Sequence, residues 1–590
     1  MFDLSSSGNN INIISSSRIC CRCLLTCRSI NSNYLEMVRK IHYLFAILCL
    51  YTGYSTAQTY KYEPYRQPIR PTKNVIVMIP DGTSIGVVSA ARWYKIYNKM
   101  GRNLSIDPYL CGTVKTYSSN APIGDSAPTT SSYMTGMPAQ TGNVAIYPKS
   151  DPANDLVDVN NEMAYQPLAT ILEAARIEQG KSTGLVVTCE FPHATPADCS
   201  AHHYRRGNYS AIGSQMANQN LDVMFGGGNA YVTQEMNRHF SEKNIRYIKN
   251  NIQAFRNVSS GKTWALFADK ELPYDLDRNT DSIPSLQEMT EKAISLLSQN
   301  QNGFFLMVEG SKVDWTAHAN DAVGCITEYI AFDNAVAAAL DFAKKDGNTT
   351  VIILPDHGNS GFTIGRRDLK SYDKATFNDL FANVSKYKKT AEGLEEILLK
   401  EKPENFKSVI KKYTEIDISD DELKSLLNSK NYQAENYMKV GESQNMNSTL
   451  VNIMNKRTYF GFTSGGHTGE EVFLAAYHPQ GDIPLGMNTN IEINRYLSDV
   501  IGLQTKLPQL TGQIFAKHNQ VFSGLQYSID KKNPDFPVLT VKNGKKTLRI
   551  TAFQSVGYLN KEKFDLGSVA VYIDVNDTFY IPQSLAEKMK

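Results

Sequence analysis

Three apolar runs of the chain are each followed by residues of the kinds that bind metal ions, and helical stretches separate the runs. They are Val75–Ile79 followed by Asp81, Phe304–Val308 followed by Glu309, and Val351–Leu354 followed by Asp356 and His357. Short runs rich in Val, Ile, Leu and Phe between helices are typical of buried parallel strands. Ligands and catalytic groups gather at the carboxyl ends of such strands. We therefore expect these carboxylates and imidazoles to converge at one edge of a sheet and bind several metal ions.

The alternation of strand and helix patterns from residue 72 to about residue 360 predicts an α/β fold. Further strands are expected at Gly184–Thr188 and Leu221–Phe225, and helices at Leu168–Gln179 and Ser285–Gln299. This order of elements is typical of a doubly wound, mostly parallel sheet flanked by helices. We assign residues 72–504 to one domain with this architecture.

Two further regions depart from that pattern. A Lys/Glu-rich helical stretch at about 365–455 indicates an insertion, because the strand pattern resumes only at Val472–Tyr477. Ser419 and Glu422 form a capping box within it. Residues 505–590 are expected to form a small β-rich appendage that contains a hairpin. Its predicted strands are Val538–Val541 and Thr547–Ile550, joined around Asn543-Gly544, and Val569–Val575.

Composition limits the classes of partner. The chain has 590 residues, of which 42% are hydrophobic and 20% charged, and its formal net charge is +2. It can therefore bury a large core, and the charge balance does not suggest nucleic acid as a specific partner.

The N-terminal region has the pattern of an export signal. Basic residues follow Met37, an apolar stretch spans Tyr43–Tyr51, and the small residues Ser55–Ala57 come next. We predict a signal peptide that starts at Met37 and is cleaved after Ala57, so residues 1–57 comprise an upstream extension and the signal. Residues 1–36 are then an over-extended reading frame or a disordered extension. The apolar stretch is too short for a membrane span, so we expect an exported protein, periplasmic or at the cell surface, with no transmembrane span in the mature chain.

The mature chain would keep Cys111, Cys189, Cys199 and Cys325. An exported protein can pair them into two disulfides, with Cys189 and Cys199 as the natural local pair, or can bury them as four thiols. Both interpretations fit the sequence. No C-x₂-C spacing remains after residue 57, which argues against a zinc ion bound by cysteines.

Several other candidate residues are ambiguous when each is considered alone. Asp314 and His318 lie four residues apart, which would direct both toward one ion but is also typical of a surface ion pair. Ser126 precedes a stretch that can form a helix. A helix N-terminus favours a bound anion, yet serine is also an ordinary helix cap. His467 lies between glycines and by itself is compatible with a plain loop.

Taken together, these motifs resemble the alkaline phosphatase family in their order and spacing. They are Asp81-Gly82, Asp125-Ser126-Ala127, His193-Ala194-Thr195-Pro196, Ala201-His202, Arg206, Val308-Glu309-Gly310, Asp314 with His318, Asp356-His357 and His467-Thr468-Gly469. The resemblance spans roughly residues 72–500. One departure is that Pro128, Thr129 and Thr130 replace the small residues usual after the serine.

The resemblance implies an alkaline phosphatase that hydrolyses phosphate monoesters through a phosphoserine intermediate, with two Zn²⁺ ions and one Mg²⁺ ion, in a homodimer. Asp314, His318 and His467 would bind one zinc ion, and Asp356 and His357 the second. Asp81 would bridge toward a magnesium ion completed by Thr195 and Glu309. Ser126 would be the nucleophile, and Arg206 would bind two phosphate oxygens. His193 and Trp315 would lie next to the ligands, where the best-known enteric bacterial enzymes carry Asp and Lys.

Other activities share parts of this pattern. Phosphodiesterases of the same superfamily typically lack the third-metal residues, whereas Thr195 and Glu309 are both present. Related sulfatases use a C/S-x-P-x-R motif, and none follows Asp81. A non-catalytic periplasmic phosphate-binding protein would need neither a nucleophile nor a complete set of metal ligands.

Overall fold

The protein is described by a computed structural model that covers residues 68–369, 371–429 and 445–590. The predicted start at Met37 and the signal peptide lie outside these residues, as does part of the expected insertion.

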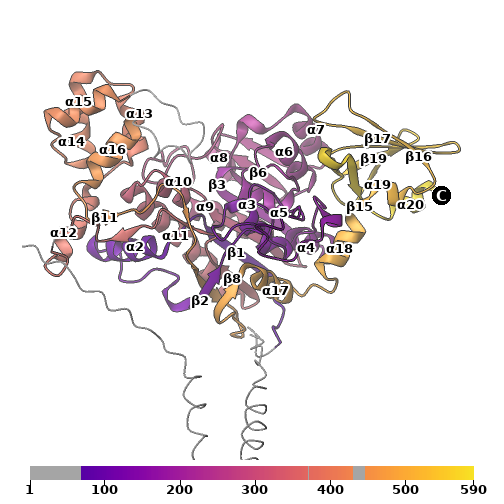
Figure 1. The fold of residues 1–590 in the computed structure, drawn as a ribbon, viewed down its shortest axis with the longest axis horizontal. Helices are drawn as coiled ribbons and strands as arrows, with labels where there is room; N and C mark the ends of the chain where they lie inside the picture. The colour runs from indigo at the N-terminus through magenta and orange to yellow at the C-terminus, as the bar shows by residue number, and fades with distance from the viewer. Residues whose placement is uncertain (1–67, 370, 430–444) are drawn as a thin grey trace, which may run out of the picture. The chain divides into compact units, whose positions relative to one another are not determined.

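A ten-stranded sheet forms the centre of the fold (Figure 1). In spatial order its strands are β14 (Gly486–Thr489), β2 (Leu110–Lys115), β13 (Val472–Tyr477), β8 (Thr349–Ile353), β1 (Asn74–Pro80), β7 (Phe304–Gly310), β3 (Ser182–Glu190), β4 (Val223–Gly227), β6 (Thr263–Leu266) and β5 (Arg246–Lys249). Every neighbouring pair is parallel except the two pairs that contain β13, which runs antiparallel to β2 and β8. The predicted doubly wound, mostly parallel sheet is confirmed.

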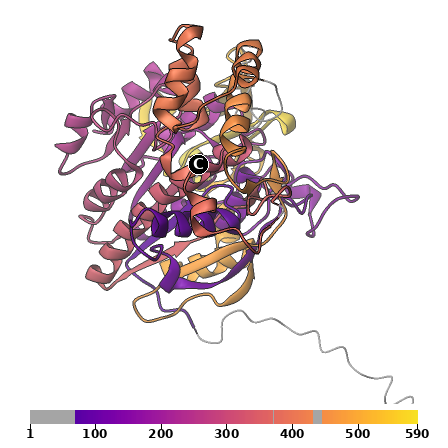
Figure 2. The same cartoon turned by 90° about the vertical axis from the view of Figure 1, so that its left-hand side faces the viewer.

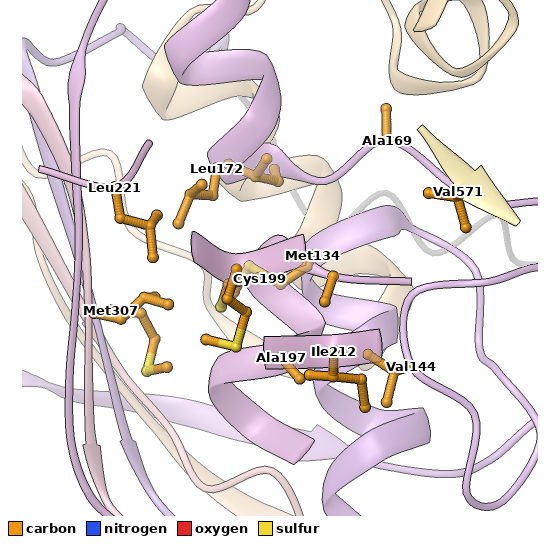
Figure 3. Close-up of a cluster of buried hydrophobic side chains, with 14 of the residues drawn as sticks. Met134, Val144, Ala169, Leu172, Ala197, Cys199, Ile212, Leu221, Met307 and Val571 are labelled. Atoms are coloured by element: carbon orange, nitrogen blue, oxygen red, sulfur yellow. The ribbon is translucent and has the colours of Figure 1, made fainter. Parts of the chain in front are cut away.

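The sheet is covered on both faces, which explains its uninterrupted apolar strands. Val75, Val77 and Ile79 of β1 point into one core, while Ile76 and Met78 point into the other. Figure 3 shows part of the first core, where labelled side chains from helices pack beside the sheet. Helices that contribute to this core are α3 (Ser126–Thr135), α4 (Ile171–Gln179), α5 (Ala194–Ser200) and α17 (Asn490–Ile501). Those of the second core include α2 (Ile85–Tyr97), α9 (Leu286–Leu297) and α11 (Ala322–Asp346).

Strand register aligns the carboxyl ends of the central strands. Ile79 of β1 lies beside Glu309 of β7, and Met78 lies beside Ile353 at the end of β8. The residues that follow these strands therefore emerge at the same edge of the sheet.

Within the described residues, α11 is the one helix long and apolar enough to cross a membrane, and 72% of its most apolar window is buried inside the fold. The same part of the chain contains Cys111, Cys189, Cys199 and Cys325 as free thiols, so Cys189 and Cys199 are not paired. Three of these thiols are buried, as the second interpretation expects, and Cys111 is half-buried. Burial raises the pKa of the Cys111 thiol to about 12.

Helices occupy the described parts of the expected insertion, and Figures 1 and 2 show them as a group of salmon-to-orange ribbons. They are α12 (Phe377–Phe381), α13 (Ala391–Leu398), α14 (Phe406–Thr414), α15 (Asp420–Asn428) and α16 (Met446–Asn455). The predicted capping box of Ser419 and Glu422 begins α15, and Glu422 also accepts two hydrogen bonds from Arg457. Asp277 and Asp321, outside the insertion, accept backbone hydrogen bonds from Thr390 and Ala391 at the start of α13.

The C-terminal region contains two antiparallel sheets. One has five strands in sequential order: β16 (Gln526–Asp530), β17 (Val538–Asn543), β18 (Lys546–Thr551), β19 (Val556–Leu559) and β20 (Glu562–Asp565). The other joins β15 (Ala516–Lys517), β22 (Thr578–Ile581) and β21 (Val571–Ile573). The β17–β18 pair is the predicted hairpin, and Gly544 adopts a φ of +55° in its turn. The strand expected at Val569–Val575 is shorter, because a 3₁₀ turn begins at Asp574.

Candidate active site

Metal-ligand side chains, all buried except the half-buried His467, form three groups at the carboxyl edge of the central strands. The groups are Asp314, His318 and His467; Asp81, Asp356 and His357; and Cys189, His193 and Glu309. Within each group, one ligand atom of every residue lies within 4.8 Å of the others.

The fold explains how residues far apart in sequence meet here. Asp81 directly follows β1, Glu309 lies at the end of β7, and Asp356 follows β8. Asp314 and His318 lie on the short helix α10 (Lys312–His318), which begins just after β7. His467 reaches the site because β12 (His467–Thr468) pairs with β9 (Gly358–Asn359), immediately after His357.

The three histidines of the first two groups present the same nitrogen to the site. Nδ1 of His318 lies 2.8 Å from the carbonyl oxygen of Gly465. Nδ1 of His467 lies 2.9 Å from that of Gly124, and Nδ1 of His357 lies 3.0 Å from that of Gly358. A carbonyl only accepts, so each Nδ1 carries the proton and each Nε2 keeps its lone pair for the site. Burial and the nearby His357 also lower the pKa of His467 to about 4, which favours a neutral ring.

The first group fits a zinc ion. Nε2 of His318 lies 3.1 Å from Nε2 of His467, close enough for both to bind one ion. Asp314 carboxylate oxygens lie 3.4 Å from the first nitrogen and 3.6 Å from the second. Nitrogen ligands about 2.0–2.1 Å from a tetrahedral zinc ion are about 3.3 Å apart, which is close to this arrangement. Three protein ligands also leave a position open for water or substrate.

The second group fits a cation for an electrostatic reason. Nε2 of His357 lies 3.4 Å from Asp81 Oδ1 and 3.6 Å from Asp356 Oδ2. Burial, with repulsion from Asp356 and Asp314, raises the pKa of Asp81 well above its usual range. Carboxylates packed this closely without water ionise together only when a bound cation offsets their charge.

Ser126 lies within the second group. It is fully buried as the first residue of α3, and its hydroxyl oxygen lies 3.3 Å from His357 Nε2. The same oxygen is 3.3 Å and 3.4 Å from the two carboxylate oxygens of Asp81. The hydroxyl therefore lies at the positive end of a helix and among the candidate metal ligands, where an oxyanion would be stabilised.

Arg206 reaches the site through Asp125, the residue before Ser126. Its Nη1 donates to Asp125 Oδ1 at 2.5 Å, and its Nη2 lies 3.1 Å from His193 Nε2. Burial alone would raise the pKa of Asp125, but the positive charge of Arg206 dominates and lowers it to about 2. Asp125 is thus a charged partner that holds the guanidinium beside Ser126, a role that we did not predict from the sequence.

The third group contains a residue that the sequence did not reveal. Cys189 Sγ lies 3.5 Å from Glu309 Oε2, and burial raises the pKa of Glu309 to about 8. Thr195 is buried on α5, and its hydroxyl acts to lower that pKa. The signal that could have identified Cys189 is its position at the end of β3, beside β7.

The two neighbouring residues expected from the resemblance meet beside this group. The rings of His193 and Trp315 lie edge to face with centroids 5.9 Å apart. The buried ammonium of Lys312, on α10, lies 4.7 Å from the centre of the Trp315 ring. A cation is therefore present beside this group, although residue 315 itself is an uncharged tryptophan.

The chain matches known phosphatases over most of its length. A family profile described as "Alkaline phosphatase" matches residues 72–503. "Alkaline phosphatase 3" of Bacillus subtilis is 33% identical over 448 residues, which is 74% of this chain and 90% of that protein. "Alkaline phosphatase 4" of the same organism is 34% identical over 75% of this chain and 92% of its own length.

Solved structures show the same architecture. A cold-active alkaline phosphatase from Shewanella sp. has a TM-score of 0.62 and is 26% identical, covering 72% of this chain and 99% of its own. The alkaline phosphatase of Thermus thermophilus has a TM-score of 0.63 at 23% identity, covering 75% and 94% of the two chains. That second likeness is one of fold.

A substitution at a residue that is not itself a proposed ligand tests zinc binding by Asp314, His318 and His467. Asn359 donates from Nδ2 to Asp314 Oδ1 at 2.7 Å and so orients the carboxylate. Asn359→Ala is predicted to weaken zinc binding about 10–100-fold, the usual effect of losing such an orienting contact. The exposed Asn257→Ala is the control. Zinc retention during titration with a chelator, followed by mass spectrometry, measures both, and equal retention would contradict the assignment.

Proposed function

The chain belongs to the alkaline phosphatase family, and we propose that it hydrolyses phosphate monoesters to an alcohol and inorganic phosphate through a phosphoserine intermediate on Ser126. The chain is an alkaline phosphatase by family membership, and the enzymes of this family depend on metal ions. The observation that carries the finer proposal is the position of the Ser126 hydroxyl, 3.3 Å from His357 Nε2 and from Asp81.

The proposed metal complement is two Zn²⁺ ions and one Mg²⁺ ion. Residues of the first zinc site would be Asp314, His318 and His467, those of the second Asp356 and His357 with Asp81, and those of the magnesium site Thr195 and Glu309 with Asp81. Bound metal ions of this kind lower the pKa of a serine hydroxyl and of water and offset developing negative charge.

The protein's own groups would act in two displacements at phosphorus. In the first, Ser126 Oγ forms a bond to phosphorus while the bond from phosphorus to the ester oxygen breaks, and the alcohol leaves. Arg206 would bind two phosphate oxygens through its planar guanidinium, with Asp125 fixing its orientation. In the second, the oxygen of a water molecule bonds to phosphorus and the bond to Ser126 Oγ breaks, which restores the hydroxyl.

Charge favours monoesters over diesters. The four buried carboxylates of Asp81, Glu309, Asp314 and Asp356 offset only part of the charge of three divalent ions. The remainder suits a phosphate monoester, which carries two negative charges at alkaline pH, better than a diester with one.

Ser126→Ala is predicted to abolish phosphoserine formation and to lower kcat by several orders of magnitude, because the nucleophile is lost while the metal ligands remain. Residual turnover by direct attack of water is expected. Trapping with labelled phosphate at acid pH, followed by peptide mapping, measures the intermediate. Ser131→Ala, on the same helix but hydrogen-bonded to Asp198, is the matched control. Label on another residue in the unaltered protein would sink the role of Ser126.

A substrate comparison separates the remaining activities. We expect p-nitrophenyl phosphate to be hydrolysed far faster than bis-p-nitrophenyl phosphate, with loss of activity in a chelator and recovery with zinc. Thr195→Ala should retain more activity than His467→Ala, because it leaves both proposed zinc sites complete. Faster hydrolysis of the diester would instead indicate a phosphodiesterase, and tight phosphate binding without turnover would indicate a binding protein.

Export and dimer formation stay predictions from the sequence. The basic, apolar and small residues of 37–57 support a cleaved signal, and the family resemblance supports a homodimer. The intact mass of protein recovered from its native host tests the first of these, because a mature chain that retains residues 1–36 would contradict it.

A further inference from the structure

The outer face of the C-terminal five-stranded sheet presents a row of polar side chains. Thr540 of β17 pairs with Arg549 of β18, which pairs with Tyr558 of β19. These three point away from Leu539 and Leu548, whose side chains are buried beneath the sheet, since alternate residues of a strand face opposite sides. The side chain of Tyr558 is 40% exposed.

This face is hollowed. A depression of about 770 Å³ is lined by Val538, Thr547, Arg549, Thr551, Tyr558, Asn560 and Lys561. A second depression of about 540 Å³ shares Val538, Thr551 and Tyr558 and continues toward α7 (Gln234–Glu242). Because the two depressions share these residues, they form one continuous groove on the sheet.

The groove is positively charged at one end. Residues 526–565 contain eight Lys and Arg against four Asp and Glu, a net charge of +4, whereas the whole chain has a net charge of +2. Among the described residues, Arg549 and Lys561 have no ion pair or side-chain hydrogen bond. The charged residues of the second depression are paired instead: Glu235 with Arg238 and Glu242 with Lys563.

The turn that carries Lys561 has positive φ at both of its residues. Asn560 and Lys561 form the two-residue connection between β19 and β20, with φ values of 49° and 80°. Glycine is the favoured second residue of such a turn, because other residues are disfavoured at positive φ. Asn560 is fixed by two hydrogen bonds to the backbone of Thr547. Lys561 is therefore held at the edge of the groove, at some cost in backbone energy.

We propose that this groove binds an acidic polysaccharide, with Arg549 and Lys561 contacting its carboxylate or other acidic groups. Tyr558 offers a ring face for a sugar, and the side chains of Thr547 and Thr551 offer hydroxyls for hydrogen bonds to sugar hydroxyls. The site is separate from the phosphatase centre, and it would hold the enzyme on an anionic polymer of its surroundings.

Two other polyanions fit the observations less well. Nucleic-acid surfaces neutralise many phosphates with many cations and stack several bases on aromatic rings, whereas this groove has two unpaired cations and one exposed ring. A membrane surface would call for exposed apolar side chains beside the cations, whereas the aliphatic residues that line the groove are half-buried (Val538) or buried (Val556).

The test uses the full mature protein with alginate, a polyuronate, and dextran, a neutral polymer, in affinity gel electrophoresis. The variant Arg549→Gln with Lys561→Gly removes both cations and relieves the strained turn. Its matched control is Arg102→Gln with Lys99→Gly, because both residues are exposed and Lys99 also has a positive φ, of 57°. Tyr558→Ala probes the contribution of the ring. Hydrolysis of p-nitrophenyl phosphate should be the same in all proteins.

The expected result is retardation of the unaltered protein by alginate but not by dextran, with binding at least about 10-fold weaker in the Arg549 and Lys561 variant and unchanged in the control. Tyr558→Ala should also weaken binding, and Lys561→Gly alone should raise the Tm while weakening binding. No retardation by alginate would overturn the proposal, as would equal losses in the variant and the control. Tighter binding to single-stranded DNA or to phosphatidylglycerol vesicles than to alginate would overturn it in favour of another polyanion.

Discussion

Four buried carboxylates lie with the imidazole rings of His318, His357 and His467 where β1, β7 and β8 end. Burial makes those negative charges costly unless cations offset them. The raised pKa values of Asp81 and Glu309 express that cost directly. The Nε2 atoms of His318 and His467 face each other at 3.1 Å, a distance that two lone pairs tolerate when an ion lies between them. The arrangement of side chains at the carboxyl edge of the sheet is therefore stable only with bound metal ions. We expect the site to lose its order when the ions are removed.

The rest of the fold places the proposed metal ligands close together. Parallel pairing aligns the carboxyl ends of the central strands. The β9–β12 pair brings His467 next to His357, although the insertion separates the two residues in sequence. The three histidine rings are oriented by hydrogen bonds from Nδ1 to backbone carbonyl oxygens. The carboxylate of Asp314 is oriented by a hydrogen bond from Asn359. The start of α13, in the insertion, donates backbone hydrogen bonds to the carboxylates of Asp277 and Asp321. Asp321 follows α10 closely in sequence. The helices of the insertion are thus linked to the segment that carries two of the proposed zinc ligands.

Much of this arrangement could be predicted from the sequence, because buried parallel strands have continuous apolar runs and their ends collect polar side chains. Val75–Ile79 and Asp81 are such a case, and the β17–β18 hairpin was evident from Asn543-Gly544. Cys189, Asn359 and Asp125 were not assigned roles in the site, because each acts there through a contact with a segment distant in sequence. A single sequence contains residue types but not such contacts. The strand at Val571–Ile573 was overestimated because its apolar pattern continues into a turn, which local hydrogen bonds determine.

The central claim is that the imidazole Nε2 atoms and the buried carboxylates bind zinc ions beside Ser126. Anomalous diffraction at the zinc absorption edge, from crystals of the mature protein grown with zinc, tests it most directly. The account predicts one peak about 2.0–2.1 Å from Nε2 of His318 and of His467, and a second at that distance from Nε2 of His357. Zinc bound elsewhere in the chain, with these nitrogens hydrogen-bonded to water or to protein groups, would contradict it.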